Sequence, residues 1–227
     1  MNAHAAALGS SLRTAPASFS ARLGRCVVGL LVCGLGIALI VAGDIGLAPW
    51  DVMHDGISER TGMPIGTAII VVGFALLIVW IPLRVRPGIG TIVNAIEIGL
   101  AVDLLLPLVP EPDHWAPRLV LMAAGVVTFG AGTGLYIGAG LGPGPRDGLM
   151  TGLAARTGYS LRLVRTVIEI AVLGCGWALG GTPGIGTAVF ALTIGPIVQF
   201  FLHRMGMWSA PLVVVADVAE TVDIAPA

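Results

Sequence analysis

Long apolar stretches alternate with short polar ones along nearly the whole chain. An apolar run of about 20 residues is long enough to cross a bilayer as a helix. A backbone in lipid must also satisfy its hydrogen bonds within its own segment, which favours helices over strands. Six runs reach this length: 24–43, 64–83, 88–109, 118–139, 163–181 and 185–205. The pattern predicts an all-α membrane protein with six transmembrane helices.

The sequence repeats itself once, without gaps, at an offset of 96 residues. This offset is too long for a solenoid unit, but it suits three membrane spans and their loops. An odd number of spans per copy would give the copies opposite orientations, so we expect a 3+3 inverted repeat, an arrangement typical of transporters. Three blocks coincide in this register: Gly46–Asp51 with Gly142–Asp147, Arg60–Gly62 with Arg156–Gly158, and Pro87–Thr91 with Pro183–Thr187.

The charges between the runs set the expected topology. Arginines gather in every second loop, and loops rich in positive charge face the cytoplasm. Both termini are therefore expected in the cytoplasm, with the protein in the inner membrane. The expected division of the chain is a disordered N-terminal tail, two three-helix halves and a cytoplasmic C-terminal tail, over residues 1–20, 21–110, 117–206 and 207–227.

Two polar segments, 49–62 and 145–158, follow the first run of each half and are too short to span. Each opens with Pro two residues before Asp and closes with Gly, a pattern that predicts a short helix. The first is amphipathic, with Met53 and Ile57 opposite a polar face that contains His54. Two placements stay open for these helices: on the membrane surface, or re-entrant from one side.

Small residues recur every four positions in the first and fourth runs. Such stripes let helix backbones approach closely in lipid, so we interpret them as packing positions. A further hypothesis is that these two helices meet near the pseudo-two-fold axis and rock against each other. The positions are Gly34, Ala38, Ala42 and Gly46 in the first run, and Gly130, Gly134, Gly138 and Gly142 in the fourth.

The Gly-x-x-Pro-x-Asp motif occurs once in each half and ends at Asp51 and Asp147. One interpretation is helix capping alone, because an acidic side chain stabilises the first turn of a helix. The other is a broken backbone whose half-helix N-termini favour an anionic substrate group. Arg146, which stands where the first half has Trp50, could supply a bidentate donor; a surface arginine of a cytoplasmic loop is the commoner case.

Two carboxylates interrupt the apolar runs. Glu97 and Glu169 lie about 10–14 Å into their runs, where a charge costs at least about 2.5–3.5 kcal/mol. Asn94 lies one turn from Glu97, and Arg165 one turn from Glu169. They are candidates for substrate or coupling-ion binding. The structural alternatives are an intrahelical pair of Arg165 with Glu169 and a protonated Glu97 bonded to a neighbouring helix.

Composition narrows the function classes. Hydrophobic residues make up 56% of the chain and charged residues 11%, and the mean hydropathy is +0.95. The net charge of −1 gives no reason to expect a nucleic-acid partner. The sequence lacks a phosphate-binding loop, a zinc-protease motif and a nucleophile elbow. We therefore expect neither an ATP-driven pump nor an enzyme, and no metal or cofactor.

The Gly46-x-x-Pro49-x-Asp51 block, the Arg60-Thr61-Gly62 ending and the Pro87-Gly88-x-Gly90-Thr91 block resemble the YczE/YyaS/YitT family of bacterial integral membrane proteins, and the YczE branch most closely. The resemblance covers about residues 24–205 and includes both copies of the repeat. It implies a small multi-span protein of the inner membrane, without an established substrate or set of catalytic residues. Some relatives are associated with export, or with production of peptide-type natural products.

The leading interpretation is a secondary transporter, more specifically an exporter of small organic molecules. Substrate would bind between the halves near the middle of the bilayer, with protons coupled through Glu97 or Glu169. The alternative is a non-transporting membrane factor that scaffolds or regulates a cytoplasmic biosynthetic enzyme. The expected partners are the lipid bilayer, a small-molecule substrate and, by analogy with other small six-span proteins, a second copy of the chain.

Overall fold

The computed structural model describes residues 18–205, so the predicted tails lie outside the described residues, apart from residues 18–20. Within this range the regular structure is helical: eight α-helices and one 3-10 helix, η1. Each of the six apolar runs forms a helix, as predicted. The elements are α2 (Phe19–Gly43), α3 (Pro49–Thr61), α4 (Ile65–Leu83), α5 (Ile89–Leu105), η1 (Leu106–Leu108), α6 (Trp115–Gly138), α7 (Pro145–Thr157), α8 (Leu161–Ala178) and α9 (Ile185–Arg204).

Five helices in the described range are long and apolar enough to cross a membrane: α2, α4, α5 with η1, α6 and α9. The sixth predicted span corresponds to α8, whose 18 residues include Arg162, Arg165 and Glu169. Three charges in so short a helix keep it out of this group. The chain therefore has the build of a multi-pass, all-helical membrane protein.

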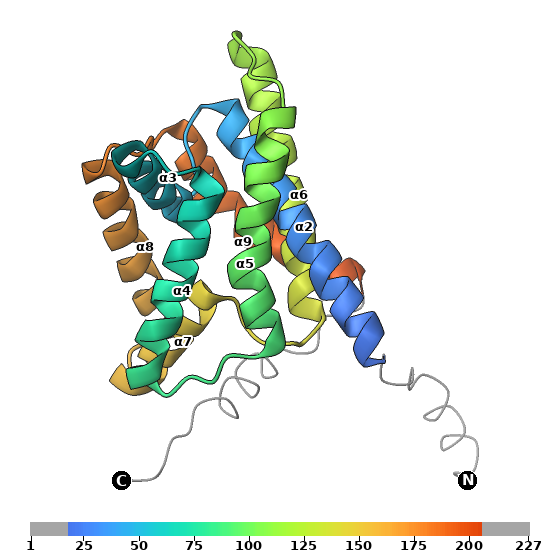
Figure 1. The fold of residues 1–227 in the computed structure, drawn as a ribbon, viewed down its shortest axis with the longest axis vertical. Helices are drawn as coiled ribbons and strands as arrows, with labels where there is room; N and C mark the ends of the chain where they lie inside the picture. The colour runs from blue at the N-terminus through green and yellow to red at the C-terminus, as the bar shows by residue number, and fades with distance from the viewer. Residues whose placement is uncertain (1–17, 206–227) are drawn as a thin grey trace, which may run out of the picture.

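The two short helices form as predicted. Pro49 and Pro145 occupy their first positions, and Gly62 and Gly158 end them in the left-handed conformation, with φ of 74° and 72°. Figure 1 shows α3 near the upper end of the bundle and α7 near the lower end. Both short helices pack against α4 and α8. Their first turns therefore lie among the other helices, not on the outside of the bundle.

Helices α2 and α6 lie against each other along one side of the bundle (Figure 1), and their backbones come into contact. A Cβ added to Gly132 of α6 would lie 2.6 Å from the carbonyl oxygen of Gly29, and one added to Gly125 would lie 2.8 Å from that of Gly36. Only glycine permits this approach. Because the contacts run in opposite order along the two helices, α2 and α6 are antiparallel.

The predicted small-residue stripes are packing positions. The two helices that carry them, α2 and α6, meet as hypothesised, but through other residues than the stripes. Gly34 faces Ala101 of α5, whereas Gly130 and Gly134 face α9. Each of these helices has a second face of small residues, and that face forms the α2–α6 crossing. The other stripe members pack elsewhere or are simply buried: Gly46 lies against Gly184, Gly142 against Gly88, Ala38 and Ala42 are buried, and Gly138 is half-buried.

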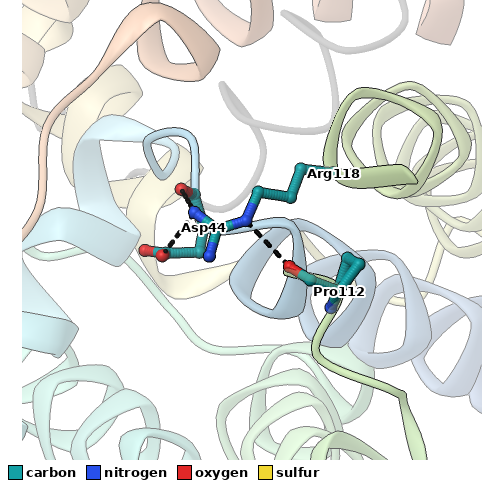
Figure 2. Close-up of polar contacts among 3 residues, drawn as sticks. All are labelled: Asp44, Pro112 and Arg118. Carbon is teal, nitrogen blue, oxygen red and sulfur yellow. Dashed lines mark hydrogen bonds and ion pairs between the residues drawn. The ribbon is translucent and has the colours of Figure 1, made fainter. Parts of the chain in front are cut away.

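Arginines join the helix ends in two similar places. Arg118 donates from Nη1 to a carboxylate oxygen of Asp44 at 2.9 Å and from Nε to the carbonyl oxygen of Pro112 at 2.9 Å (Figure 2). Arg22, at the matching position of the first half, donates from Nε to the carbonyl oxygen of Ala139 at 2.8 Å. The Arg22 bond, and a further bond from Nη1 of Arg118 to the carbonyl oxygen of Asp44 at 3.3 Å, satisfy carbonyl groups that a helix C-terminus leaves unpaired.

The halves differ in how their last two helices pack. In the first half, α4 lies against α5, and Asp103 accepts hydrogen bonds from the amide of Gly66 at 2.7 Å and the hydroxyl of Thr67 at 2.9 Å. In the second half, α8 and α9 have no comparable contact. Arg162 occupies the position that matches Gly66, and its long side chain is incompatible with so close an approach.

Candidate functional site

The first turns of α3 and α7 meet inside the bundle. The Cζ atom of Arg146, at the start of α7, lies 5.8 Å from the centre of the Trp50 ring, at the start of α3. This is a cation–π contact, and Trp50 is buried. The two residues occupy the same position in the two sequence repeats. The N-termini of both short helices therefore point into one region.

A buried acid–histidine pair lies on α3 beside this contact. Nδ1 of His54 is 3.2 Å from Oδ1 of Asp51, and both side chains are only 2% exposed. Burial lowers the pKa of His54, an effect that exceeds the opposing effect of the Asp51 carboxylate. The ring is therefore neutral near pH 7. In that state Nδ1 donates its proton to Asp51 and leaves Nε2 as an acceptor.

The matching aspartate of the second half has a different partner. The hydroxyl of Tyr136, on α6, donates to Oδ2 of Asp147 at 2.9 Å. A Cβ placed on Gly144 would lie 3.3 Å from this hydroxyl, and 3.4 Å from both Asp147 Oδ2 and the side-chain nitrogen of Asn94. Three polar groups from α5, α6 and α7 thus converge where the chain enters α7.

A small cavity lies between these groups, with a volume of about 20 Å³. That is room for about one water molecule. Its polar lining comes from His54, Asn94 and Arg146, and the apolar residues of α4 and α5 close the other side. Among the described residues, the Arg146 guanidinium has no hydrogen-bond or ion-pair partner. The cavity therefore exposes unused donors.

The predicted site residues fall into two groups. Asn94 and Arg146 line the cavity, and Asp51 and Asp147 bind the side chains next to it. Glu97 and Glu169 do not line it. The sequence favoured these two carboxylates as coupling-ion candidates, whereas the polar side chains of the cavity come from α3, α5 and α7.

Each of the two carboxylates lies in its own surroundings. Oε1 of Glu169 accepts from Nε of Arg165 at 2.8 Å, which is the intrahelical pair considered as the structural alternative. Glu97 is half-buried on α5, near Cys26 of α2, and its Oε2 has no partner among the described residues.

Sequence reasoning missed His54 and Tyr136. It placed His54 on the polar face of α3, opposite Met53 and Ile57, and gave it no role in the site. In the structure α4 and α8 cover that helix and leave the His54 side chain 2% exposed. The spacing of Asp51 and His54 held a usable signal, because residues three apart on a helix can pair. Tyr136 interrupts a run of glycines and aliphatic residues, which marks a polar group in a buried helix.

A family model, described as a family of unknown function (DUF6198), matches residues 20–203. The chain belongs to this family. It is 40% identical over 174 residues to an uncharacterized protein of Haemophilus influenzae, with 77% of this chain and 80% of that protein covered. It is 34% identical over 179 residues to the uncharacterized membrane protein YczE of Bacillus subtilis, with 78% and 83% covered.

A third relative, the uncharacterized protein YyaS of Bacillus subtilis, is 25% identical over 77% of this chain and 89% of its own length. No solved structure matches the chain. These similarities confirm the resemblance to YczE and YyaS that the motifs indicated. The word "membrane" in the name of YczE agrees with the apolar helices of this member of the family.

Proposed function

We propose that the chain is a secondary transporter of small organic molecules in the bacterial inner membrane. The substrate passes through the region where the first turns of α3 and α7 meet. The observation that carries this proposal is the cavity lined by His54, Asn94 and Arg146. Transporters commonly bind substrate at the ends of broken or half-length helices near the middle of the bilayer.

The proposal includes six spans, with α8 as the fifth, arranged as two inversely oriented halves. Its support is that contacts recur with their partners exchanged at the repeat offset. The amide of Gly90 donates to the carbonyl oxygen of Leu141 at 2.8 Å, and the amide of Gly186 donates to that of Ile45 at 2.8 Å. Such an exchange is what a two-fold axis produces. An axis in the membrane plane agrees with the antiparallel crossing of α2 and α6.

Trp50 and Arg146 support the same axis. They are repeat-related residues in contact with each other, and a residue can meet its own counterpart only close to the axis. In this arrangement both termini are cytoplasmic. The helices α3 and α7 are then re-entrant, from the outer and the inner side respectively.

The packing of the short helices suggests how the centre opens. Helix α3 of the first half makes its larger contact with α8 of the second, and α7 of the second half makes its larger contact with α4 of the first. A movement of one half against the other therefore separates the first turns of α3 and α7. Protons are the proposed coupling ion. His54 is a better candidate carrier than Glu97 or Glu169, because its ring lines the cavity.

Flux measurements in proteoliposomes test this proposal. The purified full chain is loaded with a mixture of metabolites under a pH gradient, and release of each solute is compared with that from protein-free vesicles. We expect selective release by the wild type and its loss in His54→Gln, with Arg156→Gln as a control at the exposed end of α7. Folding of each variant is checked by size-exclusion chromatography. Wild-type vesicles that release no solute beyond the protein-free background would refute a transport function.

One observation favours the alternative, a membrane accessory factor for a cytoplasmic enzyme. The cavity of about 20 Å³ is far smaller than a typical small-molecule pocket, as expected of a bundle that never opens. A transporter with this structure must pass through a state in which α3 and α7 separate. The flux experiment separates the two functions, because an accessory factor releases no solute.

A further inference from the structure

We infer that the transported molecule carries a carboxylate group, and that Arg146 binds this group between the first turns of α3 and α7, with Asn94 and His54 as further donors. That this molecule is transported rests on the proposed function. That the cavity binds a carboxylate follows from the charges and hydrogen-bond donors around it.

The two carboxylates near the cavity already have partners. The Asp51 carboxylate is 3.2 Å from the His54 ring, and the Asp147 carboxylate accepts from the Tyr136 hydroxyl at 2.9 Å. Arg146 has no such partner among the described residues, and its guanidinium lies over the Trp50 ring. Partly buried N–H donors without an acceptor are unfavourable. A bound anion would supply that acceptor.

The electrostatic balance at the site includes two helix N-termini. Two helix N-termini face it, and each contributes roughly half a positive charge. Together with Arg146 they offset the two aspartates, so the empty site is close to neutral. A singly charged anion that arrives with one proton keeps this balance, whereas a doubly charged phosphate does not.

The shape of the Arg146 guanidinium suits a carboxylate. A guanidinium and a carboxylate are both planar and form two parallel hydrogen bonds. The Arg146 Cζ atom lies 5.8 Å from the centre of the Trp50 ring, and its N–H donors bond to no side chain among the described residues. The side-chain nitrogen of Asn94 adds a neutral donor at the cavity wall. The cavity of about 20 Å³ holds about one water molecule, so a carboxylate group binds only when the first turns of α3 and α7 move apart.

His54 makes carboxylate binding depend on pH. With Nδ1 directed at Asp51, Nε2 of the neutral ring can only accept a hydrogen bond. It becomes a donor to a carboxylate when the ring is protonated. The charged groups that act on His54 are Asp51 from its own helix and Arg146 from α7, and α4 and α5 contribute apolar residues and Asn94. Carboxylate binding therefore takes up a proton at His54.

Thermal unfolding of the detergent-solubilised full chain measures binding with sodium formate and sodium acetate as probes. Sodium chloride and methylammonium chloride at equal ionic strength are the reference salts. We expect formate or acetate to raise the melting temperature saturably, as a ligand of the folded state does, and the reference salts to have no such effect. The apparent affinity should rise severalfold between pH 8 and pH 6, a range in which formate stays ionised.

Variants then locate the site. Arg146→Gln should weaken formate binding at least tenfold, because it removes a bidentate charged pair. Arg146→Lys should fall between it and the wild type. Arg156→Gln, on the exposed last turn of the same helix, should bind as the wild type does. If the Arg146 variants do not fold, the comparison of formate with chloride and methylammonium on the wild type still shows whether the chain binds a carboxylate.

An equal shift with sodium chloride, or an equal loss of affinity in Arg156→Gln, would overturn the inference, because both indicate unspecific salt effects. Formate binding that depends on Arg146, in a chain that releases no solute from vesicles, leaves the carboxylate site standing and refutes transport. Selective flux of an uncharged or cationic solute, without formate binding, would support transport and refute the carboxylate site.

Discussion

The replacement Gly36→Ala tests the packing on which the fold depends. Gly36 lies where α2 crosses α6, and its added Cβ would be 2.6 Å from the Phe129 nitrogen, 2.7 Å from its Cβ and 2.8 Å from its Cα. Two of these three atoms belong to the backbone of α6, so no side-chain rotation relieves the contact. The two helices must move apart by roughly 0.8 Å before ordinary van der Waals separation is reached.

The size of the effect follows from two opposing contributions. Overpacking a tightly packed contact destabilises a protein by about 1–3 kcal/mol. Replacing glycine by alanine inside a helix stabilises it by about 0.5–1 kcal/mol. We therefore expect Gly36→Ala to lower the free energy of unfolding by up to about 2.5 kcal/mol. At this chain length that corresponds to a fall in melting temperature of up to roughly 10 °C.

Gly24 provides the matched control on the same helix, because nothing lies within 4 Å of its added Cβ. Gly24→Ala brings the same gain in helix propensity without any clash, so the melting temperature should stay the same or rise. Both variants are measured in one detergent by thermal unfolding monitored through circular dichroism. Equal melting temperatures for Gly36→Ala and Gly24→Ala would refute the close backbone contact of α2 and α6.

Three further predictions concern single side chains. Asp103→Asn should lower stability by about 1–3 kcal/mol in thermal unfolding, because the carboxylate accepts from both the Gly66 amide at 2.7 Å and the Thr67 hydroxyl at 2.9 Å, and asparagine keeps one acceptor oxygen; an unchanged melting temperature contradicts this. Trp80→Phe should cost about 1–3 kcal/mol in the same assay, since it leaves the buried Pro145 carbonyl oxygen without its donor at 3.0 Å; stability equal to the wild type would show that this bond is not needed. Glu169→Gln should change stability by less than about 1 kcal/mol, because exposed ion pairs contribute little, and leave vesicle flux intact; loss of flux would return Glu169 to the transport site.

Much of the secondary structure follows from local sequence signals. Pro49 and Gly62 mark the two ends of α3, because proline suits a first helical turn and glycine the left-handed residue after the last. Pro145 and Gly158 do the same for α7. Signals of this kind act within a few residues, so they can be read without knowing the tertiary fold.

Which faces meet could not be predicted in this way. The run in α2 has Gly34 on one face and Gly36 on another, and both are buried. Spacing identifies both as close-packing positions, but the choice of partner depends on all the other helices. Gly34 packs on α5 and Gly36 on α6.

The site shows the same division. Arg146 was singled out because it stands at the repeat position of Trp50, and Asn94 because it lies one turn from Glu97; both line the cavity. His54 was placed only on the polar face of an amphipathic helix. In the structure α3 is enclosed by α4 and α8, so Asp51 and His54 of that face are buried and pair with each other.

The most direct test of the account asks whether the two halves have opposite orientations in the membrane. Thr61 and Thr157 are exposed and occupy matching positions at the ends of α3 and α7. Single cysteines are placed there in a Cys175→Ser background, since the other two thiols in the chain, Cys26 and Cys33, are buried. A membrane-impermeant maleimide should label Thr61→Cys in intact cells and Thr157→Cys only after the membrane is opened. Labelling of both positions from the same side would contradict the inverted arrangement and, with it, the meeting of two half-helices from opposite sides of the membrane.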